Sequence, residues 1–174
     1  MSSTTLNSEI NEWDDSDINL DSHLLRGIYA IGFEKPSPVQ KKVIKPMIKV
    51  RENGKRRDII AQAQSGSGKT GGFTVGSLCI VNPELKRTQV LILAPTHELA
   101  LQNYTVLESL ATHAKISYQL TIGGVPVSKD AERMANNIPQ VVVGTAGRIH
   151  DLIRREIIDT SYIKLIVLDE ADEM

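Results

Sequence analysis

Short apolar runs alternate with segments of helical periodicity along most of the chain. The apolar runs that predict buried strands lie at 58–61, 89–94, 117–122, 141–143 and 164–168. The segments that predict helices after these strands lie at 71–81, 97–112, 129–136 and 146–154. Continuous β-branched runs of this length, separated by helices, are typical of a parallel sheet. We therefore expect an α/β fold whose mostly parallel sheet carries helices on both faces.

The part of the chain before the first predicted strand has a different pattern. Residues 1–21 contain six acidic side chains and no Lys or Arg, which predicts a polar lead that is disordered at its start. Trp13 is expected to dock against the folded part. From Asp21 the apolar spacing predicts a helix that Gly32 ends, and a second helix follows Pro38. We assign residues 1–20 to an acidic, partly disordered lead and residues 21–174 to one domain.

A glycine-rich loop follows the first predicted strand. Its sequence, AQSGSGKT at 63–70, places Gly-Lys-Thr at the start of a helix, as in phosphate-binding P-loops. Small residues let successive backbone N–H groups face phosphate oxygens, and the helix N-terminus adds the positive end of its dipole. Lys69 can then reach the β- and γ-phosphates, and the Thr70 hydroxyl can bind Mg²⁺. Ala63 stands where the general pattern has Gly, and the alternative is a surface turn before a helix.

Two carboxylates follow the last predicted strand. Ligands of parallel sheets gather at the carboxyl ends of the strands, so Asp169 and Glu170 are expected beside the glycine-rich loop. There Asp169 can hold Mg²⁺, directly or through a water. Glu170 can orient or deprotonate the water that attacks the γ-phosphate. The alternative is an ordinary acidic loop that also contains Asp172 and Glu173.

Composition narrows the class of protein. The 174 residues are 41% hydrophobic and 24% charged with a net charge of −1, so a nucleic-acid site would have to be a local patch.

The basic stretch 49–57 is expected to be a solvated surface, with a phosphate-binding role as the alternative. Cys79, the one cysteine, is expected to be buried in the core. No apolar run approaches the roughly 18 residues of a membrane span, and we expect a soluble intracellular protein.

Several stretches, taken together and in order, resemble the DEAD-box RNA helicases. They are GFEKPSPVQ (32–40, Q motif), AQSGSGKT (63–70, motif I), PTHELA (95–100, motif Ia), Gly123-Gly124 (GG element), TAGR (145–148, motif Ib) and DEAD (169–172, motif II). The resemblance runs from about Trp13 to Met174 and implies a RecA-like P-loop domain. Within the family, the sequence is most similar to translation initiation factor 4A and its close relatives.

The resemblance implies ATP and Mg²⁺ as ligands. Gln40 would hydrogen-bond the adenine edge, to which an amide offers both a donor and an acceptor. Phe33 would stack on the ring, with core packing as the alternative, and Lys35 would lie nearby. The other implied nucleotide ligands are Gln64, Ser65, Gly66, Ser67, Gly68, Lys69 and Thr70. The implied catalytic residues are Lys69, Asp169 and Glu170, and the implied Mg²⁺ ligands are Thr70 and Asp169, partly through water.

The resemblance also implies contacts with the backbone of single-stranded RNA. Backbone N–H groups, helix N-termini and a few basic side chains would hold phosphates independently of sequence. The residues implied are Pro95, Thr96, His97, Gly123, Gly124, Thr145, Gly147 and Arg148. Taken alone, the glycine pair would be a turn and Arg148 a solvated helix residue. His97 replaces the Arg and Ala146 the Pro that are usual in the family, so we expect weaker or redistributed RNA binding.

The resemblance covers only the first part of a helicase. The chain ends directly after motif II, before the family's Ser-Ala-Thr motif and its second RecA-like domain, which supplies arginines to the transferring phosphoryl group. We expect this chain to bind ATP-Mg and RNA, to hydrolyse ATP poorly by itself and not to unwind a duplex. Expected partners are single-stranded RNA or duplex ends, the second RecA-like domain and translation-initiation scaffold proteins, in the cytoplasm or nucleus and without a membrane.

Two other functions stay open at this point. One is a non-catalytic module that binds RNA or a translation partner and competes with a full-length helicase. The other is an unrelated P-loop enzyme such as a small-molecule kinase. The segment around Gln40 argues against the kinase.

Overall fold

The computed structural model describes residues 9–16, 18–54, 56–64 and 66–174. The chain forms two compact units. Unit 1 comprises Met1–Cys79 and Thr112–Ala114, and unit 2 comprises Ile80–Ala111 and Lys115–Met174. The predicted disorder at the start of the chain falls on residues 1–8, outside the described residues. Within the described part, no helix is both long and apolar enough to cross a membrane.

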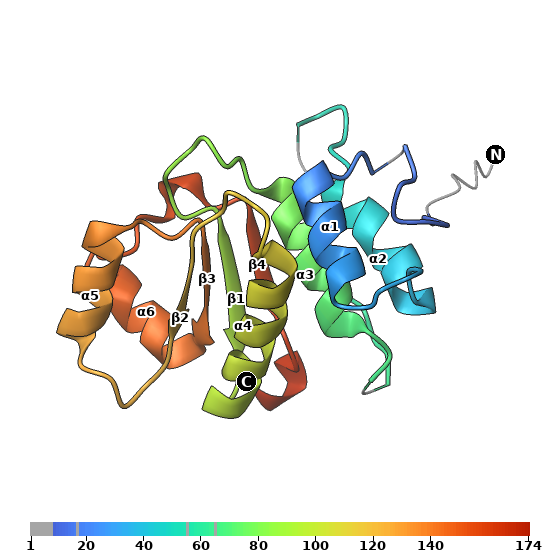
Figure 1. Ribbon diagram of the computed structural model, residues 1–174. Coiled ribbons are helices and arrows are strands. Elements are labelled where there is room, and N and C mark those ends of the chain that lie inside the picture. The colour runs from blue at the N-terminus through green and yellow to red at the C-terminus, as the bar shows by residue number, and fades with distance from the viewer. Residues whose placement is uncertain (1–8, 17, 55, 65) are drawn as a thin grey trace. The chain divides into compact units, whose positions relative to one another are not determined.

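Unit 2 is built on a parallel sheet, as the alternation predicts. Its four strands are β1 (Val90–Ala94), β2 (Tyr118–Thr121), β3 (Val141–Thr145) and β4 (Leu165–Leu168). Their order is β2-β3-β1-β4, so β1 pairs with β3 on one side and β4 on the other. Because all pairs are parallel, the carboxyl ends of the four strands lie along one edge of the sheet (Figure 1).

Helices cover both faces of this sheet. The helices of unit 2 are α4 (His97–Ala111), α5 (Val127–Asn136) and α6 (Ala146–Arg154), with short 3₁₀ turns at Thr160–Tyr162 and Ala171–Glu173. On one face, Leu91 and Val142 form a core cluster with Met134 of α5 and with Ile149 and Leu152 of α6. Side chains alternate along a strand, so their neighbours face the other side. There α4 contacts β1, β2 and β3 (Figure 1).

Two buried glutamines tie the loop before β1 to the amino ends of the strands. The Gln140 amide donates to the carbonyls of Asn82, Pro83 and Leu85 at 2.9–3.1 Å. The Gln89 amide donates to the Asn82 and Leu85 carbonyls at 2.8 and 2.9 Å. These bonds satisfy the two glutamine amides, which burial would otherwise leave without partners.

Unit 1 contains three helices whose starts follow from local sequence. They are α1 (Ser22–Ala30), α2 (Pro38–Ile48) and α3 (Lys69–Ile80). The Asp21 side chain caps α1 by accepting from the His23 N–H at 2.8 Å, and Gly32 after α1 has a φ of +83°. That φ is in the left-handed region where glycine has no steric penalty, which explains why the helix ends there. Helix α3 begins at Lys69, two residues before the predicted start.

The acidic lead is folded where it is described. Ile10 and Trp13 are fully buried and Ile18 nearly so. The Ile10 N–H donates to the Lys41 carbonyl at 3.1 Å, which fixes this segment on α2. The apolar side chains spaced along the lead therefore give residues 9–16 and 18–20 a packed role that their acidic composition does not reveal.

The expectation of a strand at 58–61 is wrong. These residues form no strand, and Ile60 is 99% exposed. A strand is stable only where a neighbouring strand takes up its backbone N–H and C=O groups, and no such pairing reaches this segment in the described sheet. The apolar composition of residues 58–61 predicted a strand, but composition does not show whether a neighbouring strand is present to pair with it.

Close packing of β2 against β3 makes a glycine at 144 a requirement, and this can be tested. A Cβ on Gly144 would collide with the Thr121 backbone carbonyl and hydroxyl. We predict that Gly144→Ala lowers the free energy of unfolding by about 2–3 kcal/mol, since the strands must separate to accommodate the methyl group. The measurement is urea denaturation followed by circular dichroism.

The matched control is Gly147→Ala in α6, where an added Cβ meets nothing within 4 Å. That change should leave stability unaltered or raise it by up to about 1 kcal/mol, because alanine favours the helix. Equal unfolding curves for the two variants would contradict the packing argument.

Candidate functional site

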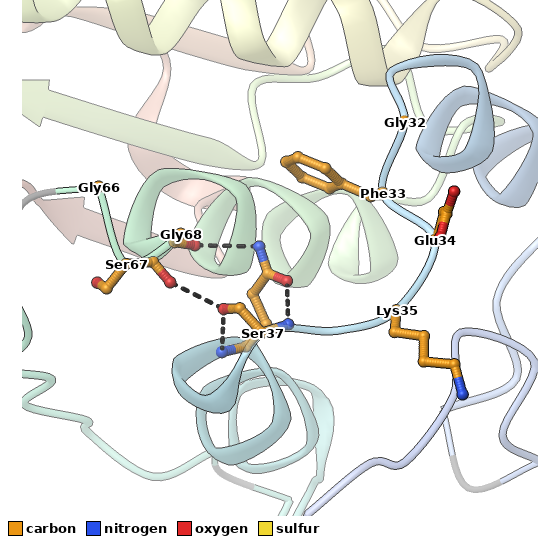
Figure 2. A pocket seen from close by; sticks show the side chains of 9 residues that line it. Gly32, Phe33, Glu34, Lys35, Ser37, Gly66, Ser67 and Gly68 are labelled. Carbon is orange, nitrogen blue, oxygen red and sulfur yellow. Dashed lines mark hydrogen bonds between the residues drawn. The ribbon is translucent and has the colours of Figure 1, made fainter.

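A cavity of about 500 Å³ in unit 1 brings together two stretches that are distant in sequence. Its lining consists of Gly32, Phe33, Glu34, Lys35, Ser37, Gln40, Gly66, Ser67 and Gly68 (Figure 2). The first six precede or begin α2, and the last three belong to the glycine-rich loop. The predicted adenine-binding and phosphate-binding segments therefore share one pocket.

The first turn of α2 positions the glycine-rich loop. Ser37 and Gln40 form a reciprocal capping box, in which the Ser37 N–H donates to Gln40 Oε1 at 2.8 Å. The same side chains reach across the pocket. Ser37 Oγ donates to the Ser67 carbonyl at 2.9 Å, and Gln40 Nε2 donates to the Gly68 carbonyl at 3.2 Å (Figure 2). The Ser-x-x-Gln spacing of the capping box is visible in the sequence. The contacts of the same two side chains with the glycine-rich loop are not.

Two glycines of the glycine-rich loop lie in the left-handed region of backbone conformation. Gly66 and Gly68 have φ values of +75° and +94°, and a Cβ on Gly68 would lie only 2.8 Å from Ser37 Oγ. Ser67 Oγ is buried and makes no hydrogen bond within the described residues. A buried hydroxyl without a partner, beside glycines in the left-handed region, fits a site that takes phosphate oxygens. Ser65 lies outside the described residues.

Phe33 lies between the pocket and the acidic lead. Its ring is nearly parallel to that of Trp13, with centroids 6.4 Å apart and an interplanar angle of 14°. A Cβ on Gly71 would lie 2.7 Å from Phe33 Cε2, so the start of α3 packs closely on this ring. Lys35 pairs with Glu12 at 3.0 Å, a solvent-exposed ion pair of small energetic value. The lead therefore supports the Phe33 segment. The expectation that Trp13 docks against the folded part is confirmed, but the sequence did not identify Phe33 as its partner.

The residues predicted to contact RNA gather along the carboxyl edge of the sheet in unit 2. Pro95 and Thr96 follow β1, the glycine pair follows β2, and Thr145 ends β3. The Thr96 hydroxyl accepts from the Leu99 N–H at 3.2 Å and so caps α4. Across this edge, the Gly123 N–H donates to His97 Nε2 at 3.2 Å. His97 therefore occupies a backbone donor of the GG element.

Arg148 is held by protein partners. Its Nη1 donates to Asp130 Oδ2 at 2.7 Å, and its Nη2 donates to the Val125 carbonyl at 2.6 Å. The two side chains of this ion pair are only 11% and 2% exposed. The pair thus fastens the start of α6 to α5 and to the turn that follows Gly124. The role of Arg148 in RNA binding stays a prediction, and Asp130 is a partner that the sequence did not reveal.

The acidic pair follows β4 in unit 2. The Asp169 N–H continues the ladder to the Leu93 carbonyl at 2.9 Å, and Asp169 Oδ2 accepts from Asn103 Nδ2 at 2.9 Å. Glu170 is left-handed, with φ +47° and ψ +54°. No group of three acidic, histidine or cysteine side chains is gathered to hold a metal within the described residues. A single carboxylate fits a Mg²⁺ that is held largely by substrate phosphates and water.

Cys79 has no part in this chemistry. Burial near the end of α3 raises the pKa of its thiol to about 12, so it stays protonated and unreactive at neutral pH. The side chain of Cys79 has intermediate exposure, so the expectation that it is buried in the core is confirmed only in part.

The buried ion pair of Arg148 can be tested by stability. We predict that Arg148→Met lowers the free energy of unfolding by about 3–5 kcal/mol, because it leaves the Asp130 carboxylate buried without its partner. The control is Arg155→Met, which breaks a solvent-accessible pair between the residue that follows α6 and Asp151 of that helix, and it should cost no more than about 1 kcal/mol. Urea denaturation measures both, and an Arg148→Met curve that overlies wild type would contradict the structural role.

Comparison with solved structures supports the fold. A DEAD box protein from Methanococcus jannaschii matches 95% of this chain and 43% of its own, with a TM-score of 0.83 and 36% identity. Saccharomyces cerevisiae Dbp5 bound to RNA and ADP BeF3 matches 95% of this chain and 39% of its own, with a TM-score of 0.79 and 38% identity.

Comparison of sequences gives the same relationship. ATP-dependent RNA helicase eIF4A of Chaetomium globosum is 49% identical over 158 residues, and eukaryotic initiation factor 4A of Drosophila melanogaster is 48% identical over 158 residues. The matches cover 91% of this chain but 38% of each relative. The sequence profile of the DEAD/DEAH box helicases matches residues 37–174. The chain therefore belongs to the DEAD/DEAH box helicase family, with a RecA-like fold and an eIF4A-like sequence.

Proposed function

We propose that the chain is the ATP-binding part of an ATP-dependent, RNA-stimulated RNA helicase. The observation that carries this proposal is the pocket of unit 1, in which the capping residues of α2 hold the carbonyls of the glycine-rich loop. This arrangement couples a candidate base-binding segment to a candidate phosphate-binding loop. A small-molecule kinase that binds ATP would need the same coupling, so it is the match to the DEAD/DEAH box helicases over residues 37–174 that argues against that alternative.

The proposed nucleotide contacts use atoms that the pocket offers. Phe33 lines the pocket and would stack on the base. Gln40 uses one amide hydrogen and one lone pair of its oxygen in the contacts described above, which leaves one of each for an adenine edge. The loop amides and Lys69 would hold the phosphates, together with the Ser67 hydroxyl.

The proposed hydrolytic step depends on the residues after β4. Bound Mg²⁺ would neutralise charge on the phosphates, with Thr70 and Asp169 as its protein ligands. Glu170 would orient the attacking water and accept its proton. Its left-handed backbone is a conformation that costs a non-glycine residue about 1 kcal/mol or more and recurs at functional sites. The match covers 38% of the length of the eIF4A relative. We propose that full activity depends on a second RecA-like domain, which these 174 residues do not contain.

The proposed RNA surface is the carboxyl edge of the sheet in unit 2. Dbp5, a structural neighbour, has been solved bound to RNA and ADP BeF3, which supports the proposal that this chain binds RNA as well as nucleotide. In this chain the Gly123 N–H is bonded to His97, so binding of a phosphate there would have to replace that bond. We propose that this exchange reduces the affinity for RNA.

Nucleotide binding can be followed through Trp13, the one tryptophan of the chain, because it stacks on Phe33. We predict that ATP changes the Trp13 emission saturably and that GTP does so only at much higher concentration. Lys69→Ala should weaken ATP binding by about 10- to 100-fold, the loss expected for a charge-assisted phosphate contact. Calorimetric titration gives the same affinities independently.

The control for Lys69→Ala is Lys86→Ala, which removes an exposed lysine from unit 2. It should bind ATP as wild type does. Failure of wild type to bind ATP by either method would overturn the proposed function. If ATP binds but Glu170→Gln does not lower RNA-stimulated phosphate release in a chain extended past Met174 with a second RecA-like domain, the result supports the non-catalytic alternative.

The proposed effect of His97 on RNA can be measured directly. We predict that His97→Arg raises the affinity for single-stranded RNA, because it frees the Gly123 N–H and adds a permanent charge with a two-pronged donor. The slope of log affinity against log salt should steepen by about 0.7, as for one extra phosphate contact. Fluorescence anisotropy of a labelled oligonucleotide measures both quantities.

The control is His23→Arg, which adds the same charge to an exposed position of α1, a helix without predicted RNA residues. Only His97→Arg should change the affinity appreciably. An equal rise in RNA affinity in the two variants would assign the effect to net charge. If neither variant binds RNA more tightly, the proposed effect of His97 on RNA binding is wrong.

A further inference from the structure

Asn103 is a buried amide on an otherwise apolar face. The inward side of α4 carries Ala100, Leu107, Leu110 and Ala111, and Asn103 lies in the same stripe with 1% of its surface exposed. An amide buried among aliphatic side chains is costly unless it is hydrogen-bonded. Asn103 therefore needs a hydrogen-bond partner that offsets the free energy lost when its amide leaves water.

That partner is the carboxylate of Asp169. Asn103 Nδ2 lies 2.9 Å from Asp169 Oδ2. An ionised carboxylate can only accept hydrogen bonds, so the amide nitrogen, not its oxygen, must face it. The backbone of Asp169 is fixed separately by the bond from its N–H to the Leu93 carbonyl. The ladder thus fixes the main chain of Asp169, and Asn103 fixes its side chain.

We propose that Asn103 is a positioning residue that holds the Asp169 carboxylate in one rotamer for a divalent cation. The inference rests on the proposed function, in which Asp169 is a ligand of Mg²⁺. Oδ2 accepts one hydrogen bond from the amide, so Oδ1 keeps both of its lone pairs for the ion. Hydrogen-bonded partners of metal-binding carboxylates orient the ligand before the ion arrives, and their loss weakens metal binding without removing a ligand.

The test is Asn103→Leu, which deletes the donor and keeps a side chain of similar size. The probe is Mn²⁺ in the presence of saturating ADP, followed by the loss of the free-ion signal in electron paramagnetic resonance. Mn²⁺ affinity should fall by about 10- to 100-fold. ADP affinity in EDTA and the midpoint of thermal unfolding should stay at wild-type values, since the ion is absent from the first measurement and leucine suits an apolar face.

The control is Thr105→Val on the same helix, which removes an exposed bond from the Thr105 hydroxyl to the Leu101 carbonyl. It should bind Mn²⁺ as wild type does. A double variant separates positioning from a general structural effect. Asn103→Leu combined with Asp169→Asn should bind Mn²⁺ as Asp169→Asn alone does, because Asn103 acts only through that carboxylate.

The outcomes distinguish the inference from the function on which it rests. If wild type binds ADP in EDTA and binds Mn²⁺ with ADP, but Asn103→Leu matches wild type, the positioning role is overturned and the function stands. A further loss of Mn²⁺ binding in the double variant, or a large fall in thermal stability of Asn103→Leu with proportional loss of ADP binding in EDTA, also overturns it. If wild type binds neither ligand, both proposals fail.

Discussion

The parallel pairing of β1 with both of its neighbours determines where the candidate chemistry can lie in unit 2. The register places Ala94 beside Thr145 and Leu93 beside Leu168, so the segments that follow three strands start at one level. Reversing any strand would move its loop to the opposite edge. Gly144 adds a second constraint, because only a residue without a Cβ lets β2 approach β3 closely enough to bring the GG element to the same edge.

Buried amides, more than apolar contacts, fix the loops of this protein. Gln40 holds the glycine-rich loop, Gln89 and Gln140 hold the turn before β1, and Asn103 holds Asp169. Apolar packing is non-directional and sets which elements touch. A buried amide is directional, and leaving it unbonded costs more than the bond gains, so it selects one loop conformation from many.

Two side chains that were predicted to face RNA already have partners within the protein. Arg148 forms a nearly buried ion pair, and His97 accepts a hydrogen bond from Gly123. The first contact is strong, because an unpaired charge at that depth would be costly. The second is a neutral bond at an exposed site, which is much easier to exchange for a phosphate. The two positions therefore differ in what RNA binding would require of them.

The sequence by itself determined the alternation of strands and helices, the limits of α6, the glycine-rich loop and the acidic pair. These features depend on residues close together in the chain, where periodicity, caps and small residues act locally. Tertiary structure decided the rest. It left 58–61 unpaired, docked Trp13 on Phe33 and paired Asn103 with Asp169. Each of these depends on a partner 20 or more positions away or on the absence of one, and local patterning carries no information about such partners.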